Sequence, residues 1–171
     1  LKVQEKQATI TLATLPTVEA QPVQMQQLFQ NLIDNALKFS KKDAPPLIQI
    51  SAEAIPSQET KNNLLLNPKL QYYKFSIKDN GIGFDPEYSQ RIFGIFQRLH
   101  GRSEYEGTGL GLAICQKIVE TNQGYIEAIS EENQGAEFVF FLPVNWFFRT
   151  SNSLSTNFKM IFQTLKLLIV D

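Results

Sequence analysis

The sequence predicts an α/β fold, a two-layer α/β sandwich in which helices pack on a sheet. Segments that alternate apolar and polar residues, as strands do, take turns along the chain with segments of helical periodicity. This order of elements is typical of a sheet covered by helices. The length of 171 residues is sufficient for one domain with a substantial core. The net charge of −1 predicts no general electrostatic attraction to nucleic acid.

The N-terminal part of the chain contains one predicted strand and one long predicted helix. Ala8 to Leu12 alternates apolar and polar side chains, and we expect it to form the first strand. A helical pattern opens at Pro22, and Pro45-Pro46 ends this region. The apolar residues of the helix recur at three- and four-residue spacings and form one stripe, which comprises Met25, Leu28, Phe29, Leu32, Ile33 and Ala36.

Two further strands and their connections are expected in the middle of the chain. Ile48 to Ala54 and Tyr73 to Ile77 alternate as strands. Between them, Pro56 to Pro68 is polar and interrupted by prolines, which predicts a loop. Tyr88 to Phe96 is expected to be a short helix. Gln97 to Gly107 is polar, charged and bounded by glycine, which predicts a mobile loop.

The next part of the chain is predicted to be a helix followed by a strand pair. Leu110 to Asn122 has a helical pattern, and Gly124 is expected to stop it. Tyr125 to Ile129 and Phe138 to Leu142 are predicted as the last two strands, with a turn near residues 133–135 between them.

The ends of the chain indicate a domain over residues 1–144 with a different segment after it. Residues 145–165 are expected to be a linker, because Thr150 to Asn157 is rich in Ser, Thr and Asn. Lys166 to Asp171 has two interpretations, the first strand of a further domain or a frayed amphipathic tail. Since the sequence begins at Leu1 rather than at a methionine, we expect it to be a fragment or a processed product.

Cysteine usage is compatible with a reducing compartment, and the apolar runs predict no membrane contact by this segment. Cys115 is the single cysteine, so no intrachain disulfide forms, and we expect a buried structural thiol. No signal-peptide pattern opens the chain. The apolar stretch Phe138 to Phe148 contains Pro143 and Asn145 and is too short to cross a bilayer. The expected location is therefore cytoplasmic, and membrane attachment of the full-length protein through segments outside this chain is left open.

Polar residues of the long predicted helix form a candidate site. Asn31 and Asn35 are one turn apart and share a face, and Lys38 lies on nearly the same side. A neutral amide oxygen suits Mg²⁺ beside phosphates, and a lysine can act as a point charge for phosphate. The alternative is that all of them are ordinary polar residues on an exposed helix face.

Two glycine-rich segments form a second candidate site. Asp79-Asn80-Gly81 follows a strand and on its own predicts a hairpin turn. The chain continues as Ile82-Gly83-Phe84, which a tight hairpin does not need, so Asp79 is a candidate acceptor for the exocyclic amine of a base. Gly107-Thr108-Gly109-Leu110-Gly111 opens a helix and can form an anion-binding nest, with a flexible hinge as the alternative.

Together these segments resemble the ATP-binding catalytic domain of sensor histidine kinases, in the superfamily shared with gyrase, Hsp90 and mismatch-repair ATPases. The resemblance covers Ala8 to Pro143, and Phe96 to Arg102 further resembles phytochrome-like and hybrid kinases. Its motifs are an asparagine box at Gln30 to Phe39, a first glycine box at Asp79 to Phe84, a phenylalanine box at Ile92 to Leu99, a second glycine box at Gly107 to Leu112 and a short glycine element at Gly135 to Phe138.

The resemblance implies ATP and Mg²⁺ as cofactors, with a role for each matched residue. Asn35 would bind Mg²⁺, Lys38 and Arg98 would contact phosphates, and Asp79 would accept the adenine amino group. The implied catalytic residues are Asn31, Asn35, Lys38 and Arg98. The implied nucleotide-binding residues are Asn35, Lys38, Asp79, Gly81, Ile82, Gly83, Phe84, Arg98, Gly107, Thr108, Gly109, Leu110, Gly111 and Leu112.

The resemblance also refines the expected fold. It implies a mixed, mostly antiparallel sheet backed by about three helices, with Gln97 to Thr108 as a mobile lid over ATP. Glu137 stands before Phe138 where many relatives have a hydroxyl residue, so a water-mediated adenine contact is left open there. In the lid, His100 is expected to be a packing residue, and Arg102 either reaches the γ-phosphate or is a solvated loop residue.

Asn31 favours kinase chemistry within the superfamily. Hydrolysing members carry a glutamate one turn before the magnesium asparagine, whereas an amide cannot act as a general base. The implied reaction is transfer of the ATP γ-phosphoryl group to a histidine on a dimerisation domain outside this chain. The alternatives are an ATP-hydrolysing member of the superfamily and a non-catalytic ATP-binding or docking module.

The implied partners are the histidine-bearing dimerisation domain and a response-regulator receiver domain, with a homodimeric full-length protein. Lys166 to Asp171 resembles the first strand of such a receiver domain. Since His100 lies in the expected lid, we expect the phosphoacceptor histidine to lie outside this chain.

Overall fold

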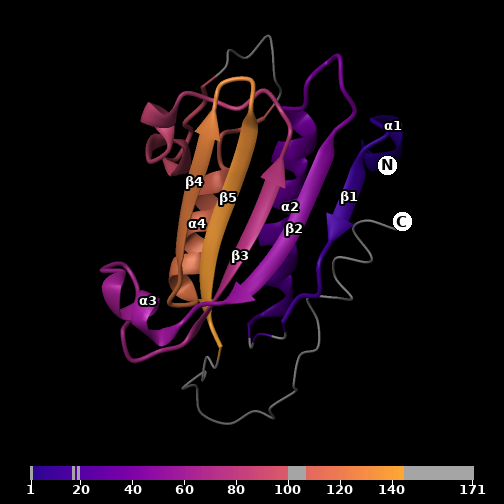
Figure 1. Ribbon diagram of the computed structural model, residues 1–171. Coiled ribbons are helices and arrows are strands. Elements are labelled where there is room, and N and C mark those ends of the chain that lie inside the picture. The colour runs from indigo at the N-terminus through magenta and orange to yellow at the C-terminus, as the bar shows by residue number, and fades with distance from the viewer. Residues whose placement is uncertain (1, 17, 19, 100–106, 145–171) are drawn as a thin grey trace.

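Five strands form one mixed, open sheet in the order β1-β2-β3-β5-β4 (Figure 1). The computed structural model describes residues 2–16, 18, 20–99 and 107–144, and the structural statements below concern these ranges. The strands are β1 (Thr9–Leu12), β2 (Leu47–Ala54), β3 (Tyr72–Asp79), β4 (Tyr125–Glu131) and β5 (Gly135–Pro143). β1 and β2 are parallel, and all other pairs are antiparallel. The predicted mixed, mostly antiparallel sheet is confirmed.

Two long helices form the second layer. α2 (Pro22–Lys38) and α4 (Gly111–Thr121) pack against each other and cover the same face of the sheet (Figure 1). The described chain also contains the short helices α1 (Lys2–Glu5) and α3 (Ser57–Asn62), which brings the α-helices to about four rather than three. The two-layer α/β sandwich is confirmed.

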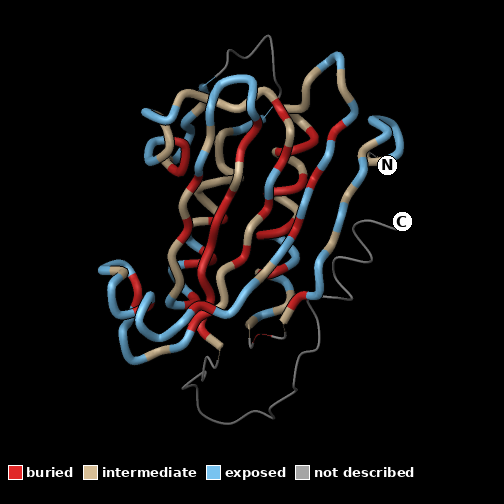
Figure 2. The backbone as a smooth tube through the Cα atoms, in the orientation of Figure 1, coloured by how far each residue is buried: buried red, intermediate tan, exposed pale blue. Residues whose placement is uncertain are grey.

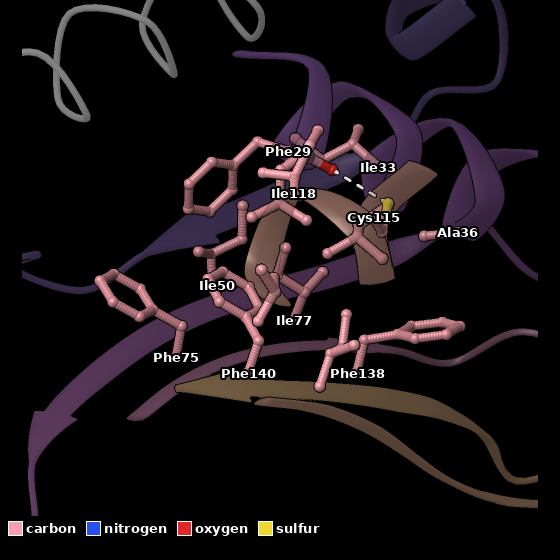
Figure 3. Close-up of a cluster of buried hydrophobic side chains, with 14 of the residues drawn as sticks. Phe29, Ile33, Ala36, Ile50, Phe75, Ile77, Cys115, Ile118, Phe138 and Phe140 are labelled. Atoms are coloured by element: carbon pink, nitrogen blue, oxygen red, sulfur yellow. Dashed lines mark hydrogen bonds between the residues drawn. The ribbon is translucent and has the colours of Figure 1, made fainter. Parts of the chain in front are cut away.

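The core lies between the two layers, where the apolar faces of the strands and helices pack together. Buried residues alternate along β2 and β3 (Figure 2). Phe75 and Phe140 stack with ring centroids 5.0 Å apart, and Phe29 of α2 meets both rings edge-on (Figure 3). The predicted apolar stripe of α2 is buried against these aromatic rings, and this fixes which side of the helix faces the sheet.

Two predictions about connecting segments were wrong. Tyr88 to Phe96 is not one helix: it contains the end of the 3₁₀ turn η1 (Pro86–Tyr88) and a second turn, η2 (Arg91–Phe93). Gly94 is extended and Phe96 has a φ of +61°, so a helix cannot continue through them. The predicted loop Pro56 to Pro68 contains α3, which carries the chain between β2 and β3.

The connection between β2 and β3 covers the opposite face of the sheet at one end. Ile55 and Leu66 are buried there against Tyr72, Val139 and Phe141, in a small cluster separate from the main core. The predicted boundary at residue 144 stays a prediction, and the predicted linker at 145–165 and the segment 166–171 lie outside the described residues. In the described part of the chain, no helix is both long enough and apolar enough to span a bilayer.

Candidate nucleotide-binding site

A cavity of about 570 Å³ lies where the end of α2, the end of β3 and the start of α4 come together. Figure 1 shows that the end of β3 and the segment after it lie at one end of the sheet. The residues that line the cavity are Glu5, Lys6, Asp34, Asn35, Leu37, Lys38, Phe39, Asp79, Gly83, Phe84, Ile92, Gln97, Arg98, Leu99, Gly107, Thr108, Gly109, Gly111, Leu112, Ala136 and Phe138. All five motifs of the sequence therefore contribute residues to one cavity.

Asp79 is the buried carboxylate of this cavity, with 9% of its surface exposed. Its Oδ1 accepts hydrogen bonds from the backbone N–H of Gly81 at 2.8 Å and of Ala136 at 3.3 Å. Burial raises the pKa of this carboxyl above its ordinary value, and the two backbone donors oppose that rise. Because Oδ1 is engaged by the backbone, the second carboxylate oxygen can accept from a ligand.

The first glycine box packs too tightly for side chains. A Cβ on Gly81 would lie 2.5 Å from the Phe39 carbonyl oxygen and 2.8 Å from Asp79 Oδ1. Gly83 has a φ of +61°, and a Cβ there would overlap the Glu131 carbonyl oxygen. Gly81 and Ile82 are not among the lining residues, so they support the wall rather than form it. Gly83 and Phe84 do line the cavity.

The polar face of α2 forms one wall. Asn35 and Lys38 are both half-buried and line the cavity, and Lys38 Nζ also lies 4.6 Å from the centre of the Phe39 ring. Asn31 is not among the lining residues. Its amide Nδ2 donates instead to the carbonyl oxygen of Gly111 at 3.3 Å, which connects α2 to the first residue of α4.

The second glycine box leads into the N-terminus of α4, beside that wall. Gly107 and Gly109 have φ values of +145° and +73°, which glycine adopts without strain. The N–H groups in the first turn of α4 have no acceptor within the helix, and Leu110 before it has no polar side chain that could accept from them. Such a helix end attracts phosphate. Thr108, Gly111 and Leu112 line the cavity, whereas Leu110 does not.

The phenylalanine box supplies apolar and basic groups. Ile92 is buried and Arg98 half-buried, and both line the cavity together with Gln97. The backbone N–H of Phe96 donates to the Gly109 carbonyl oxygen at 3.1 Å, which holds the two boxes together. His100 and Arg102, and most of the predicted lid, lie outside the described residues.

Several lining residues were not predicted as site residues. Ile92, Ala136 and Phe138 give the cavity an apolar wall suited to a ring. Glu137 faces the other side of the sheet, where it accepts a hydrogen bond from Ser76 Oγ at 2.6 Å. Its strand neighbour Ala136 is therefore the residue at the cavity. Glu5 and Lys6 also line the cavity, far from any motif in sequence.

The donor set of the cavity fits magnesium bound together with phosphates. Asn35 offers a hard amide oxygen on the wall formed by α2. In the described ranges, no group of three or more His, Cys, Asp or Glu side chains could hold a metal ion by itself. Mg²⁺ takes few protein ligands beside phosphates, so a single amide oxygen is an adequate protein contribution.

Comparison with known proteins identifies the family to which this arrangement belongs. Residues 20–145 match the family model described as histidine kinase-, DNA gyrase B- and HSP90-like ATPase. The chain belongs to this family. It is 48% identical over 143 residues to cyanobacterial phytochrome A of Nostoc sp. strain PCC 7120, covering 84% of this chain and 17% of that protein. It is 35% identical over 141 residues to the adaptive-response sensory kinase SasA of Synechococcus elongatus, covering 82% of this chain and 33% of that protein.

Solved structures agree with this assignment. The mycobacterial sensor histidine kinase MprB matches with a TM-score of 0.66 at 19% identity, over 85% of this chain and 88% of that chain, which shows the fold. Full-length ShkA, solved in complex with AMPPNP, matches with a TM-score of 0.64 at 30% identity, over 83% of this chain and 27% of that chain. The chain is therefore a histidine-kinase-type ATPase domain, and it spans only a fraction of the length of its curated relatives.

Proposed function

We propose that this domain binds ATP with Mg²⁺ in the cavity and is the phosphoryl donor of a two-component sensor histidine kinase. The observation that carries the proposal is Asp79, a buried carboxylate with one oxygen engaged by backbone N–H groups and the cavity beside it. A buried carboxylate in an apolar pocket is costly unless a ligand uses it. The exocyclic amine of adenine is a matching donor, and Ile92 and Phe138 would enclose the ring.

The remaining groups are arranged for a triphosphate. Lys38 and Arg98 would neutralise phosphate oxygens, and the N–H groups at the start of α4 would donate to them. Asn35 would hold Mg²⁺, which neutralises charge on the β- and γ-phosphates when bound. Phosphoryl transfer requires mainly positioning and charge neutralisation, and these residues supply both.

The proposed reaction breaks the bond between the γ-phosphorus and its bridging oxygen and forms a bond to a histidine nitrogen. ADP leaves, and the acceptor is a histidine on a dimerisation domain outside this chain. We propose that Asn31 contributes by holding the first residue of α4 rather than by activating water, because its amide donates to the Gly111 carbonyl oxygen. An amide there gives hydrolysis no general base.

The proposed partners follow from the same reaction. The dimerisation domain would act in a homodimer of a longer protein, and a response-regulator receiver domain would take the phosphoryl group from the histidine. The proposal includes no nucleic-acid partner and a cytoplasmic location for this domain. Two other functions compete with it: ATP hydrolysis, and ATP-dependent docking without catalysis.

Calorimetry followed by phosphotransfer separates these functions. ATP titrated into the domain with Mg²⁺ should release heat that depends on the metal, and wild type without any ATP heat would overturn the site. Labelled ATP is then supplied together with the histidine-bearing dimerisation domain of the longer protein. Labelled protein supports the kinase, release of inorganic phosphate without labelled protein supports hydrolysis, and binding with neither product supports docking.

A further inference from the structure

The segment that enters the domain forms part of the cavity wall, although it lies outside every sequence motif of the family. Glu5 ends α1, and Lys6 follows it before β1 begins. Both residues line the cavity. The sequence between this segment and the asparagine box contains β1, the loop after it and the first part of α2, so no local pattern connects the two.

The entering segment is fixed to the rest of the domain. The backbone N–H of Ala8 donates to the Val3 carbonyl oxygen at 2.9 Å, which closes the turn after α1. Val3 and Ala8 both pack against the main core. The position of Lys6 between these two anchors is therefore defined by the fold, even though its own side chain is exposed.

The Lys6 ammonium group is held at the C-terminal end of α2. Its Nζ donates to the Leu37 carbonyl oxygen at 2.7 Å and to Ser40 Oγ at 3.1 Å. An ammonium group has three N–H donors, so one remains without a partner among the described residues. Leu37 directly precedes Lys38, and the two lysines therefore bring positive charge to the same end of the helix that borders the cavity.

We propose that Lys6 is a further phosphate-binding residue of the nucleotide site, supplied by the chain that enters the domain. The inference rests on the proposed function, since the ligand is the phosphate chain of ATP or ADP. A lysine acts on phosphate as a compact point charge. Glu5 lies on the same wall with the opposite charge, and within the described ranges no partner neutralises it. Because Glu5 lies beside Lys6 and Lys6 is exposed, the contribution of Lys6 to phosphate affinity is modest.

The test compares Lys6→Met with two matched variants. Lys6→Met keeps the length of the side chain and removes its charge, and Lys6→Arg keeps the charge. Lys42→Met removes the same charge from an exposed lysine that lies with Lys6 around a neighbouring hollow but not on the cavity. Each protein is titrated with ATP, ADP and adenosine in the presence of Mg²⁺, and its thermal unfolding is measured.

Lys6→Met should weaken binding of ATP and ADP by about threefold to fivefold and leave adenosine binding unchanged. Raising the salt concentration should reduce the difference from wild type, because the lost contact is electrostatic. Lys6→Arg should retain most of the ATP affinity, and Lys42→Met should match wild type.

Two results would overturn the inference while leaving the ATP site in place. In the first, Lys6→Met binds ATP as wild type does. In the second, it loses ATP and adenosine affinity by the same factor and also unfolds at a lower temperature, which assigns Lys6 to holding the end of α2 alone. Absence of ATP binding in wild type is a different result, and it would overturn the proposed function itself.

Discussion

Replacing Asp79 by asparagine separates the contribution of this carboxylate to nucleotide binding from its contribution to the fold. The variant keeps the shape of the side chain, and its Oδ1 can still accept from the N–H groups of Gly81 and Ala136. The second oxygen becomes an NH₂ group, which is a donor. An adenine amine would then meet a donor instead of an acceptor.

The expected loss of ATP affinity follows from two effects of the substitution on that contact. A hydrogen bond to a charged acceptor contributes about 1.5–3 kcal/mol, and a buried donor left unpaired costs about 1–3 kcal/mol. A total of about 2.5–6 kcal/mol corresponds to roughly two to four orders of magnitude in the dissociation constant for ATP. The change should therefore reduce ATP binding to a level that calorimetry barely detects.

In the absence of nucleotide, Asp79→Asn should leave the stability of the domain unchanged or raise it. Burial raises the pKa of Asp79 above its ordinary value of 3.8, so the folded protein binds the proton more tightly than the unfolded chain does. Stability therefore falls as pH rises from 3.8 to the folded pKa, and the ionised carboxylate remains unfavourable for the fold above it. At neutral pH, Asp79→Asn should unfold at the same temperature as wild type or at a higher one.

Both quantities are measured on the same preparations. Titration calorimetry with ATP and Mg²⁺ gives the affinity, and thermal unfolding followed by circular dichroism from pH 3.5 to pH 8 gives the stability. The unfolding temperatures of variant and wild type should converge as the pH falls and wild-type Asp79 becomes protonated. Undiminished ATP affinity in a well-folded Asp79→Asn protein would refute the assignment of this carboxylate to adenine.

The remaining predictions concern the support of the site. Gly83→Ala should lower the free energy of unfolding by about 3–5 kcal/mol in urea titrations, because φ is +61° and the new Cβ overlaps a backbone carbonyl. The control Gly94→Ala should lower it by less than about 1 kcal/mol, because the new Cβ contacts mainly the flexible Gln97 side chain. The Cys115 thiol is buried and burial raises its pKa to about 12, so iodoacetamide at pH 8 should label it only as the protein unfolds; fast labelling of the native protein would contradict this. Asn31→Ala removes the hydrogen bond to the Gly111 carbonyl oxygen, and it should weaken ATP binding about fivefold while adenosine binding is unchanged. Equal losses of affinity for both ligands would contradict the role of Asn31 in positioning the start of α4.

Periodicity predicted the main elements of the fold because each buries one face. The apolar stripe of α2 and the alternation in β2 and β3 are direct consequences of packing two layers against each other. The segment from Tyr88 to Phe96 lacks such a signal. Its buried residues Ile92 and Phe93 are adjacent in sequence, and the left-handed backbone at Phe96 that stops a helix is tied to the second glycine box by the hydrogen bond to Gly109.

The candidate site was predictable to the extent that its residues lie in motifs. Asn35, Lys38, Asp79 and Arg98 do line one cavity, as the resemblance to histidine kinases implied. Lys6 was not predictable, because its approach to α2 depends on how the chain enters the sheet and not on any local pattern. Asn31 illustrates the opposite case, since its helix position indicated the cavity wall and its hydrogen bond is made to α4 instead.

Gly81 and Gly135 act on the shape of the wall around Asp79 more than on the ligand. Gly81 does not line the cavity, and a Cβ on it would meet both the Phe39 carbonyl oxygen and Asp79 Oδ1. A Cβ on Gly135, in the last glycine element, would overlap the carbonyl oxygen of Asp79 itself. Since these contacts come from α2, β3 and β5, only small residues let the three elements converge on one carboxylate. Substitutions at these glycines should therefore weaken ATP binding through the position of Asp79, and adenosine and ATP should lose affinity by the same factor.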